Sequence, residues 1–349
     1  MKAAVWYDKK NVKIEERELK NVGENDVKVK VAWSGICATD LHEYEYGPIL
    51  IPTDDAHPMT NEKAPLVLGH EFSGVVEEVG ANVTNVKVGD RVAVYPLTTS
   101  GDNKDNVDRY YEFFSMGLHT DGGFAEYAVT SSDNAVKIPD ALPLDKAAVA
   151  EPFSVATQAV KDSGVSEGDA VAGFGAGPIG LFTIAAAVAR GAKEIFAFDL
   201  SDERLEKAKA VGATHAVNSG ETNPVEFIKE KYPKGVDASL EVAGVKVTFD
   251  QAIAATKPLG KVVVVAMHGK DFDFNPVQLM LSGVSLSSSL GYSRETFNEV
   301  IEQLIDDKVN VDPIITNKIE LDELVSEGFE RLPKDLSEAK VLVKLSGEL

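Results

Sequence analysis

The sequence predicts an α/β fold with a β-rich domain and a domain built on a doubly wound parallel sheet. Residues 1–140 contain short runs rich in valine, aromatic residues and alternation, punctuated by Gly, Asp and Pro, which is typical of the strands of a barrel or sandwich. From about residue 165 strands and helices alternate, which is typical of a parallel sheet covered on both faces by helices. A chain of 349 residues is also long enough for two domains.

The individual elements follow from hydrophobic pattern and turn residues. In the first part we expect strands at 1–7, 26–33, 72–80, 90–96, 122–129 and 134–139. In the second part we expect strands at 169–174, 194–200, 238–244, 261–267 and 284–290, with helices at 181–190, 202–212 and 246–257. A helix at 294–308 and a strand at 339–345 follow. The segment Thr98–Asp121 fits neither pattern, and a loop of this length is usually functional or interfacial.

The composition excludes several classes of protein. Hydrophobic residues make up 44% of the chain and charged residues 26%, which is ordinary for a soluble globular protein, and no apolar run approaches the roughly 18 residues of a membrane helix. The net charge of −21 repels phosphate backbones, so nucleic acid is not expected as a partner. The first residues lack the pattern of a secretory signal, and a single cysteine fits a reducing cytoplasm.

The segment GFGAGPIG carries a dinucleotide-binding pattern. Gly175, Gly177 and Gly180 form G-x-G-x-x-G between an expected strand and an expected helix. In this pattern the first glycine permits a tight turn, the second lets the backbone approach a pyrophosphate, and the third lets helix and strand pack closely. Pro178 and Ile179 directly precede the expected helix, whose N-terminus offers free N–H groups and a dipole that favour phosphate.

An acidic residue, Asp199, ends the next expected strand, nineteen residues after Gly180. A carboxylate at this place accepts hydrogen bonds from the ribose hydroxyls of adenosine and repels a 2′-phosphate, which favours NAD over NADP. A strand-end turn or a helix N-cap is the structural alternative for this residue. We expect Arg204 to contact the adenine or its ribose.

Residue types that bind zinc stand in the first part of the chain. The lone thiol, Cys37, lies in GICATDLH, and His70 and Glu71 are adjacent in GHEFSG. Thiolate, imidazole and carboxylate are ligands that zinc prefers, and a catalytic zinc has about three protein ligands and one open position. Glu151 stands between apolar residues, so we expect a cation or a donor beside it. A buried structural cysteine, a surface His–Glu pair and a helix N-terminal acid are the simpler alternatives.

Taken together, these motifs resemble the medium-chain, zinc-dependent alcohol dehydrogenases. The resemblance covers essentially the whole chain and rests on GICATDLH, GHEFSG, VGDRV, the Glu151–Pro152 pair, GFGAGPIG and Asp199. It implies a GroES-like catalytic domain, residues 1–150 with 291–349, and a Rossmann NAD-binding domain, residues 151–290, with the active site between them. The Glu-Pro pair is similar to the polyol branch of the family, in which it replaces a cysteine ligand.

The resemblance also implies a set of metal ligands. Cys37 and His70 would surround a catalytic zinc together with Glu151 or Glu71, and the sequence does not decide between these two glutamates. Asp40 is expected to hold His70 through the second ring nitrogen, because such support fixes the tautomer of a zinc-bound imidazole.

A proton relay and a reaction are implied as well. Thr39 matches the hydroxyl that relays the substrate proton, and His42 matches the imidazole that passes it to solvent; a strand threonine and an exposed histidine are the alternatives. The reaction would be hydride transfer between NAD and an alcohol activated by zinc. The segment ATDLHEYEYGPILIP and the insertion before LGHE are similar to members that act on small vicinal diols and hydroxyketones: 2,3-butanediol, acetoin and diacetyl.

Other functions stay open at this point. A sorbitol-type polyol dehydrogenase or a threonine dehydrogenase would have the same site. A zinc-free, crystallin-like binding protein would share the two-domain frame and bind no metal, but the thiol, imidazole and acids argue against it.

One departure from the family concerns residues 98–120. Relatives often hold a second, structural zinc there with four closely spaced cysteines, whereas this segment contains none. We therefore expect one zinc ion per chain and aromatic packing of RYYEFFSMGL in place of the second ion. The serine-rich VSLSSSL indicates an edge strand that can pair with its copy, so a homodimer or homotetramer is expected.

Overall fold

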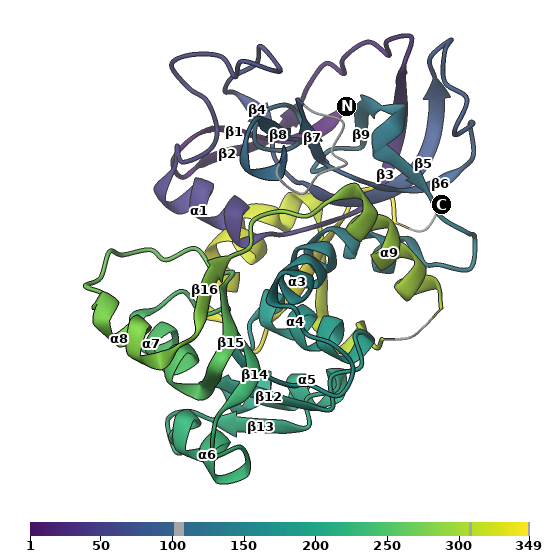
Figure 1. Ribbon diagram of the computed structural model, residues 1–349. Helices are drawn as coiled ribbons and strands as arrows, with labels where there is room; N and C mark the ends of the chain where they lie inside the picture. The colour runs from purple at the N-terminus through teal and green to yellow at the C-terminus, as the bar shows by residue number, and fades with distance from the viewer. Residues whose placement is uncertain (101–107, 307–308, 348–349) are drawn as a thin grey trace. The chain divides into compact units, whose positions relative to one another are not determined.

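The computed structural model describes residues 1–100, 108–306 and 309–347 of the chain (Figure 1). The chain divides into two compact units. Unit 1 comprises Met1–Pro152, Ser293–Asp306 and Ile315–Leu349, and unit 2 comprises Phe153–Tyr292 and Asp307–Ile314. No helix among the described residues is long and apolar enough to span a bilayer.

Unit 1 is built on a seven-stranded sheet in which β3 pairs with β5, β9 and β18. Its pairs are antiparallel except for β17 with β18. The strands in the order of the sheet are β10 (Ala135–Lys137), β6 (Arg91–Val94), β5 (Glu71–Val79), β3 (Asp26–Gly35), β18 (Lys340–Lys344) and β17 (Ile315–Glu320), with β9 (Tyr127–Ser131) beside β3. Smaller sheets hold β1 (Lys2–Asp8), β2 (Asn11–Glu16) and β4 (Leu66–Val67), and β7 (Leu97–Thr99) with β8 (Phe113–Ser115).

The alternation of β3 shows why these residues form a sheet. Val27, Val29 and Val31 are fully buried and pack in one core cluster with Phe72 and Val92, while the lysines between the valines are partly exposed. Successive side chains of a strand point to opposite faces. The period of two in the sequence therefore places one face of β3 in the core.

The helices of unit 1 differ in how well the sequence indicates them. The helix α9 (Arg294–Ile305) is predicted by its apolar periodicity. The short helix α2 (Leu144–Ala148), which precedes α3 (Ala150–Ser163), is not predicted. The helix α1 (Ala38–Tyr46) was not predicted. It has little apolar periodicity and begins because the Asp40 carboxylate accepts a hydrogen bond from the backbone N–H of Cys37 at 2.9 Å, as in a capping box.

Unit 2 contains a six-stranded parallel sheet with helices on both faces (Figure 1). The strands in order are β13 (His215–Asn218), β12 (Glu194–Asp199), β11 (Ala170–Phe174), β14 (Val236–Glu241), β15 (Thr256–Val264) and β16 (Ser285–Ser288). Right-handed crossovers put α4 (Pro178–Ala189) and α5 (Asp202–Val211) on one face and α6 (Pro224–Lys231), α7 (Lys246–Ala255) and α8 (Pro276–Ser282) on the other. The pair β13 and α6 was not predicted, because both are short.

The strand order fixes where a ligand can bind in unit 2. From β11 the chain runs outward through β12 to β13 and then returns to β14 on the other side of β11. In sheets of this kind ligands bind outside the carboxyl ends of the strands at the point where the order reverses. The glycine turn after β11 and Asp199 at the end of β12 both lie at this edge.

Candidate functional site

Three neighbouring strands of unit 1 bring the candidate zinc ligands together. Gly35, the last residue of β3, pairs with Glu71 of β5 on one side and with Leu342 of β18 on the other. Cys37 follows Gly35 by two positions, and His70 directly precedes β5. The register of the sheet therefore places thiol, imidazole and carboxylate at one end of the same strands.

The three ligand groups lie close enough to share a metal ion. One ligand atom each of Cys37, His70 and Glu71 lies within 4.8 Å of the others, and this is the group with metal-binding geometry within the part of the chain that the structure describes. His70 is 5% and Glu71 0% exposed. A Cβ at Gly35 would stand 2.1 Å from Oε2 of Glu71, so glycine makes room for the carboxylate. A set of one thiol, one imidazole and one carboxylate fits zinc better than magnesium or calcium.

A buried acid orients His70. Nδ1 of His70 faces Oδ1 of Asp40 at 3.7 Å, and among the described residues neither atom has a hydrogen-bond partner. This leaves Nε2 as the nitrogen that can face a metal. Burial opposes a charge on His70, but Asp40 and Cys37 outweigh it and hold the pKa of His70 well above its ordinary value. The negative charges of Asp40 and Cys37 therefore favour a positive charge on His70.

A buried lysine binds Glu71. Nζ of Lys340 lies 2.8 Å from both carboxylate oxygens of Glu71 and 2.8 Å from the carbonyl oxygen of Ile36. Burial lowers the pKa of Lys340, but Glu71 and Cys37 raise it, and the net direction is upward. Sequence reasoning missed Lys340, because a lysine in an expected strand gives no sign of an ion pair with a residue 269 positions away.

The second candidate glutamate stands beside this group. Glu151 lies in the first turn of α3 and is 8% exposed. Its carboxylate is not among the atoms within 4.8 Å of one another, but its charge raises the pKa of His70 and of Lys340. The structure thus brings Cys37, His70 and Glu71 together and leaves Glu151 within electrostatic reach.

The two residues expected to relay a proton lie on α1. The Sγ–H of Cys37 donates to Oγ1 of Thr39 at 3.6 Å, and both Thr39 and His42 are partly buried. Residues three apart on a helix share one face. The helix therefore presents the hydroxyl and the imidazole on the same side, with the hydroxyl next to the thiol.

The glycine turn of unit 2 combines two tight positions with an open one. Gly175 has φ +114°, and a Cβ there would stand 3.1 Å from Ala243. A Cβ at Gly180 would stand 2.1 Å from the carbonyl oxygen of Gly175. A Cβ at Gly177 would meet no protein atom within 4 Å. The fold therefore requires the first and third glycines, whereas Gly177 leaves open space beside the turn.

A helix N-terminus, a guanidinium group and one carboxylate belong to the residues next to the glycine turn. Gly177 is the N-cap of α4, and Pro178 and Ile179 form its first turn. The carboxylate of Asp199 accepts hydrogen bonds from the backbone N–H of Ala176 at 2.7 Å and of Ser201 at 2.9 Å. A guanidinium nitrogen of Arg204 lies 4.0 Å from Asp199. The carboxylate of Asp199 is thus hydrogen-bonded to the glycine turn, and its oxygens can still accept a hydrogen bond from a ribose hydroxyl.

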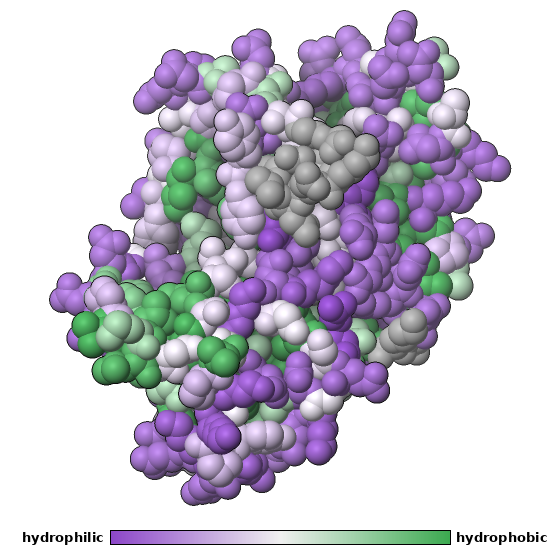
Figure 2. Space-filling view, viewed as in Figure 1, coloured by the Kyte–Doolittle hydropathy of each residue, from purple (hydrophilic) through white to green (hydrophobic). Residues whose placement is uncertain are grey.

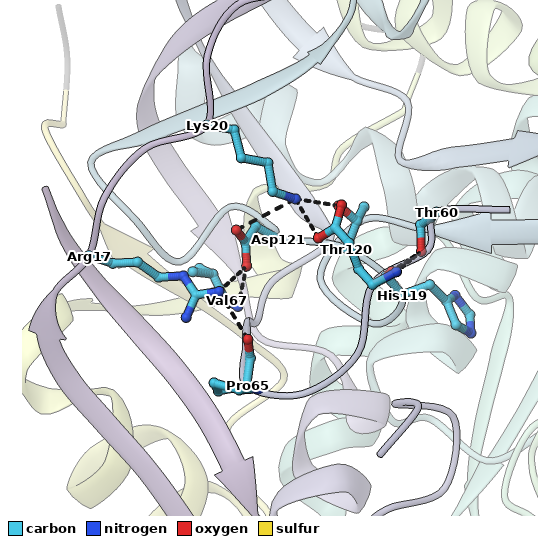
Figure 3. A network of polar contacts seen from close by, with 9 residues as sticks. Arg17, Lys20, Thr60, Pro65, Val67, His119, Thr120 and Asp121 are labelled. Carbon is cyan, nitrogen blue, oxygen red and sulfur yellow. Dashed lines mark hydrogen bonds and ion pairs between the residues drawn. The ribbon is translucent and has the colours of Figure 1, made fainter. Parts of the chain in front are cut away.

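Polar contacts connect the end of the segment 98–120, which was expected to lack a structural zinc, to neighbouring loops (Figure 3). Residues 101–107 lie outside the described ranges, and of the rest β7 pairs with β8. The carboxylate of Asp121 accepts from the backbone N–H of Val67 at 2.9 Å and from Arg17 at 3.3 Å, and it lies 3.6 Å from Lys20. The hydroxyl of Thr60 donates to the carbonyl oxygen of His119 at 2.7 Å. These contacts hold the end of the segment to neighbouring loops.

Tilted and edge-to-face ring contacts also hold this segment. The ring of His119 lies 4.4 Å from that of His57 and 6.0 Å from that of Phe113, and its Nδ1 accepts from the backbone N–H of Ser115 at 3.0 Å. Burial, and then the charge of His57, lower the pKa of His119 to about 4.

This lowered pKa predicts a pH dependence of stability. Below the ordinary histidine pKa of about 6.5 the unfolded chain takes up a proton that folded His119 takes up only near pH 4, so the unfolding free energy falls as pH falls through this window. The slope for one proton is about 1.4 kcal/mol per pH unit. Urea titrations should show a shallower slope for His119→Asn, whose amide oxygen can still accept from Ser115; an unchanged slope contradicts the assignment.

The chain matches known proteins over nearly its whole length. Residues 23–140 match the model of the alcohol dehydrogenase GroES-like domain, and residues 178–306 match that of the zinc-binding dehydrogenase. The chain is 41% identical to the (R,R)-butanediol dehydrogenase of Bacillus subtilis (strain 168), over 99% of each chain, and 33% identical to the sorbitol dehydrogenase of the same organism, over 95% of this chain and 93% of the other. The crystal structure of 2R,3R-butanediol dehydrogenase from Bacillus subtilis superposes with a TM-score of 0.93 at 40% identity, covering 98% of this chain and 99% of that one.

These matches confirm the fold class and the kind of enzyme that the sequence predicts. One family model describes a GroES-like domain and the other a zinc-binding dehydrogenase domain. The identity and coverage extend over nearly the whole chain. The chain therefore belongs to the zinc-binding medium-chain alcohol dehydrogenase family.

Proposed function

We propose that this chain oxidises a small vicinal diol with NAD and reduces the corresponding hydroxyketone with NADH, with 2,3-butanediol, acetoin and diacetyl as its substrates. The observation that carries the proposal is that Cys37 and His70 lie together with two buried acids, Glu71 in contact and Glu151 within electrostatic reach, in a chain that is 41% identical to a butanediol dehydrogenase. The open glycine turn beside Asp199 supports a dinucleotide as the second reactant.

Cys37 and His70 would hold one zinc ion per chain, together with a glutamate. Both oxygens of Glu71 already bind Lys340, so we infer that Glu151 is the third ligand and that Glu71 stays with the lysine. A zinc ion in this place supplies Lewis acidity, which polarises an alcohol oxygen and lowers its pKa. Asp40 keeps His70 in one tautomer and orientation.

The chain's own residues would then move the proton of the alcohol. The Thr39 hydroxyl, next to Cys37, accepts this proton and passes its own toward His42, which releases it to solvent. NAD bound at the glycine turn would supply the hydride acceptor, so that the alcohol would yield a ketone, NADH and one proton.

Thr39→Val should lower kcat about 100-fold, because an isosteric methyl group cannot relay a proton. Zinc content and the dissociation constant for NADH should not change, since the threonine methyl and backbone remain. Thr39→Ser restores the hydroxyl and should restore most of the rate. Steady-state kinetics of the three proteins measure this effect, and a Thr39→Val enzyme with wild-type kcat would exclude the relay.

Asp199→Gly should relax the preference for NAD over NADP at least about tenfold. The carboxylate that accepts from ribose hydroxyls also repels a 2′-phosphate, and glycine removes both effects. The ratio of kcat/KM for the two cofactors measures the change. Asp202→Gly, on the first turn of α5, is a matched control that should leave the ratio as it is, and an unchanged ratio in Asp199→Gly would place the ribose elsewhere.

The substrate class is tested by turnover on a panel. We expect the highest kcat/KM with one stereoisomer of 2,3-butanediol and of acetoin. The value for 2-butanol should be lower, because it lacks the second vicinal oxygen and the contact that this oxygen adds in the site. The values for sorbitol and threonine should be lower as well. The match to a sorbitol dehydrogenase makes a polyol the second candidate. Faster turnover of sorbitol than of every butanediol isomer would replace the first proposal by the second.

We also propose that two copies associate through β16. This strand is the edge of its sheet, and apolar side chains gather around it and α8 in the space-filling view (Figure 2). Their exposed fractions are large: Leu259 91%, Val277 53%, Met280 70%, Leu281 77% and Leu290 51%. Pairing of β16 with its copy would cover them. Sedimentation equilibrium measures the mass, and a stable monomer contradicts the association.

A cytoplasmic location completes the proposal. The chain has one cysteine, and it is free and partly exposed. A reducing compartment keeps such a thiol available as a ligand.

A further inference from the structure

A buried carboxylate in unit 2 connects two loops and a helix. Glu241, the last residue of β14, is 0% exposed, and its Oε2 lies 3.0 Å from Nε2 of His268, which follows β15. Its Oε1 accepts from the backbone N–H groups of Ala243 at 3.0 Å and Gly244 at 2.9 Å, and from the hydroxyl of Thr248 in α7 at 2.7 Å. One side chain therefore fixes the loop after β14, the first turn of α7 and the loop after β15.

The loop that follows Glu241 packs directly against the glycine turn. A Cβ at Gly175 would stand 3.1 Å from the backbone nitrogen of Ala243, and one at Gly180 would stand 3.3 Å from Cγ2 of Val242. A Cβ at Gly244 would stand 2.8 Å from the carbonyl oxygen of Met267. The turn after β11 thus touches the loop after β14, which touches the loop after β15, and all three lie at the carboxyl edge of adjacent strands.

We propose that Glu241 and His268 are positioning residues for the dinucleotide, acting through the glycine turn. This inference rests on the proposed function, because it takes NAD(H) as the ligand at this edge. Without His268 the buried carboxylate of Glu241 loses one hydrogen-bond partner, and the loop after β15 is tied to Glu241 only through backbone hydrogen bonds from Val265 and Ala266. The loops under Gly175 can then shift, and a turn that must match a pyrophosphate closely binds it less well.

A control pair lies in the same sheet, at the amino ends of the strands. Oε2 of Glu194 lies 3.0 Å from Nε2 of His215, the same distance as in the Glu241–His268 pair. Glu194 begins β12 and His215 begins β13, so this pair lies at the amino ends of the strands, where parallel sheets do not bind ligands. A general loss of stability would follow from breaking either pair, whereas a loss of NADH binding should follow only from breaking Glu241–His268.

The experiment is a titration of the zinc-containing enzyme with NADH, followed by its fluorescence. His268→Ala should raise the dissociation constant about tenfold, as the loss of one charge-assisted hydrogen bond predicts. His268→Gln, whose amide nitrogen can donate to Glu241, and His215→Ala should both stay within about twofold of wild type. In steady state, KM for NAD should rise in His268→Ala while kcat at saturating NAD stays within about twofold.

A second measurement is the rate of hydrogen exchange at the backbone amides of Ala243 and Gly244. This rate should be higher in His268→Ala and unchanged in His215→Ala. Wild-type affinity in His268→Ala, equal losses in both alanine variants, or unchanged exchange would each overturn the positioning role. Wild-type protein that binds no NADH would instead overturn the proposed function itself, and the inference with it.

Discussion

Cys37→Ala should lose its zinc ion and its activity on 2,3-butanediol, with kcat at least about a thousandfold below wild type. The expected loss corresponds to the several kcal/mol that a Lewis-acidic ion contributes to an alcohol oxidation. Because Cys37 belongs to unit 1 and the glycine turn belongs to unit 2, the dissociation constant for NADH should stay within about twofold. Elemental analysis, stopped-flow kinetics and NADH fluorescence on one sample measure the three quantities.

Two controls separate metal loss from misfolding. Wild-type protein treated with a chelator should lose activity to the same degree and regain it when zinc is added, whereas zinc should not rescue Cys37→Ala. Ser73→Ala, on β5 two residues after Glu71, removes a buried hydroxyl that donates to the carbonyl oxygen of Leu144 and should retain zinc. Full activity in a metal-free Cys37→Ala protein would refute the zinc mechanism.

Gly177→Ala should weaken dinucleotide binding without destabilising the fold. Gly180→Ala should mainly lower the stability of the fold. The new methyl group at position 177 meets no protein atom within 4 Å, so the unfolding free energy should change by less than about 1 kcal/mol. It occupies the space needed by a pyrophosphate, so KM for NAD should rise at least about tenfold. At position 180 the methyl group would collide with the carbonyl oxygen of Gly175 at 2.1 Å, which should cost about 1–3 kcal/mol of stability.

Urea unfolding and NADH titration of both variants measure this contrast. Gly173→Ala is a further control, because a Cβ there would meet its nearest atom at 3.8 Å, an ordinary contact, and it lies within β11. Wild-type affinity for NADH in a folded Gly177→Ala protein would show that the dinucleotide does not approach the turn.

Much of the fold could be predicted because its signals are local. The alternating valines of β3 and the apolar run of β11 followed by glycines record their own environment within a few residues. The helix α1 lacks such a signal, since its start depends on one hydrogen bond from Cys37 to Asp40. The helix α4 begins at Pro178, three residues before the apolar run at 181, because Gly177 caps it.

The candidate site was predictable only in part, for a similar reason. Cys37 and His70 attract attention by residue type, and the resemblance to a family links them. Lys340 and its contact with Glu71 join strands that are distant in the chain, and nothing near Lys340 in the sequence indicates that contact. Glu241 lay inside an expected strand, and its role depends on loops that follow two different strands.

The most direct test of the account is X-ray absorption at the zinc edge of the purified enzyme, combined with a zinc count. The proposed zinc mechanism requires one zinc ion per chain, with one sulfur neighbour at about 2.3 Å and nitrogen and oxygen neighbours at about 2.0–2.2 Å. It also predicts that the sulfur signal disappears in Cys37→Ser. An active enzyme that contains no zinc, or whose zinc has no sulfur neighbour, would contradict it.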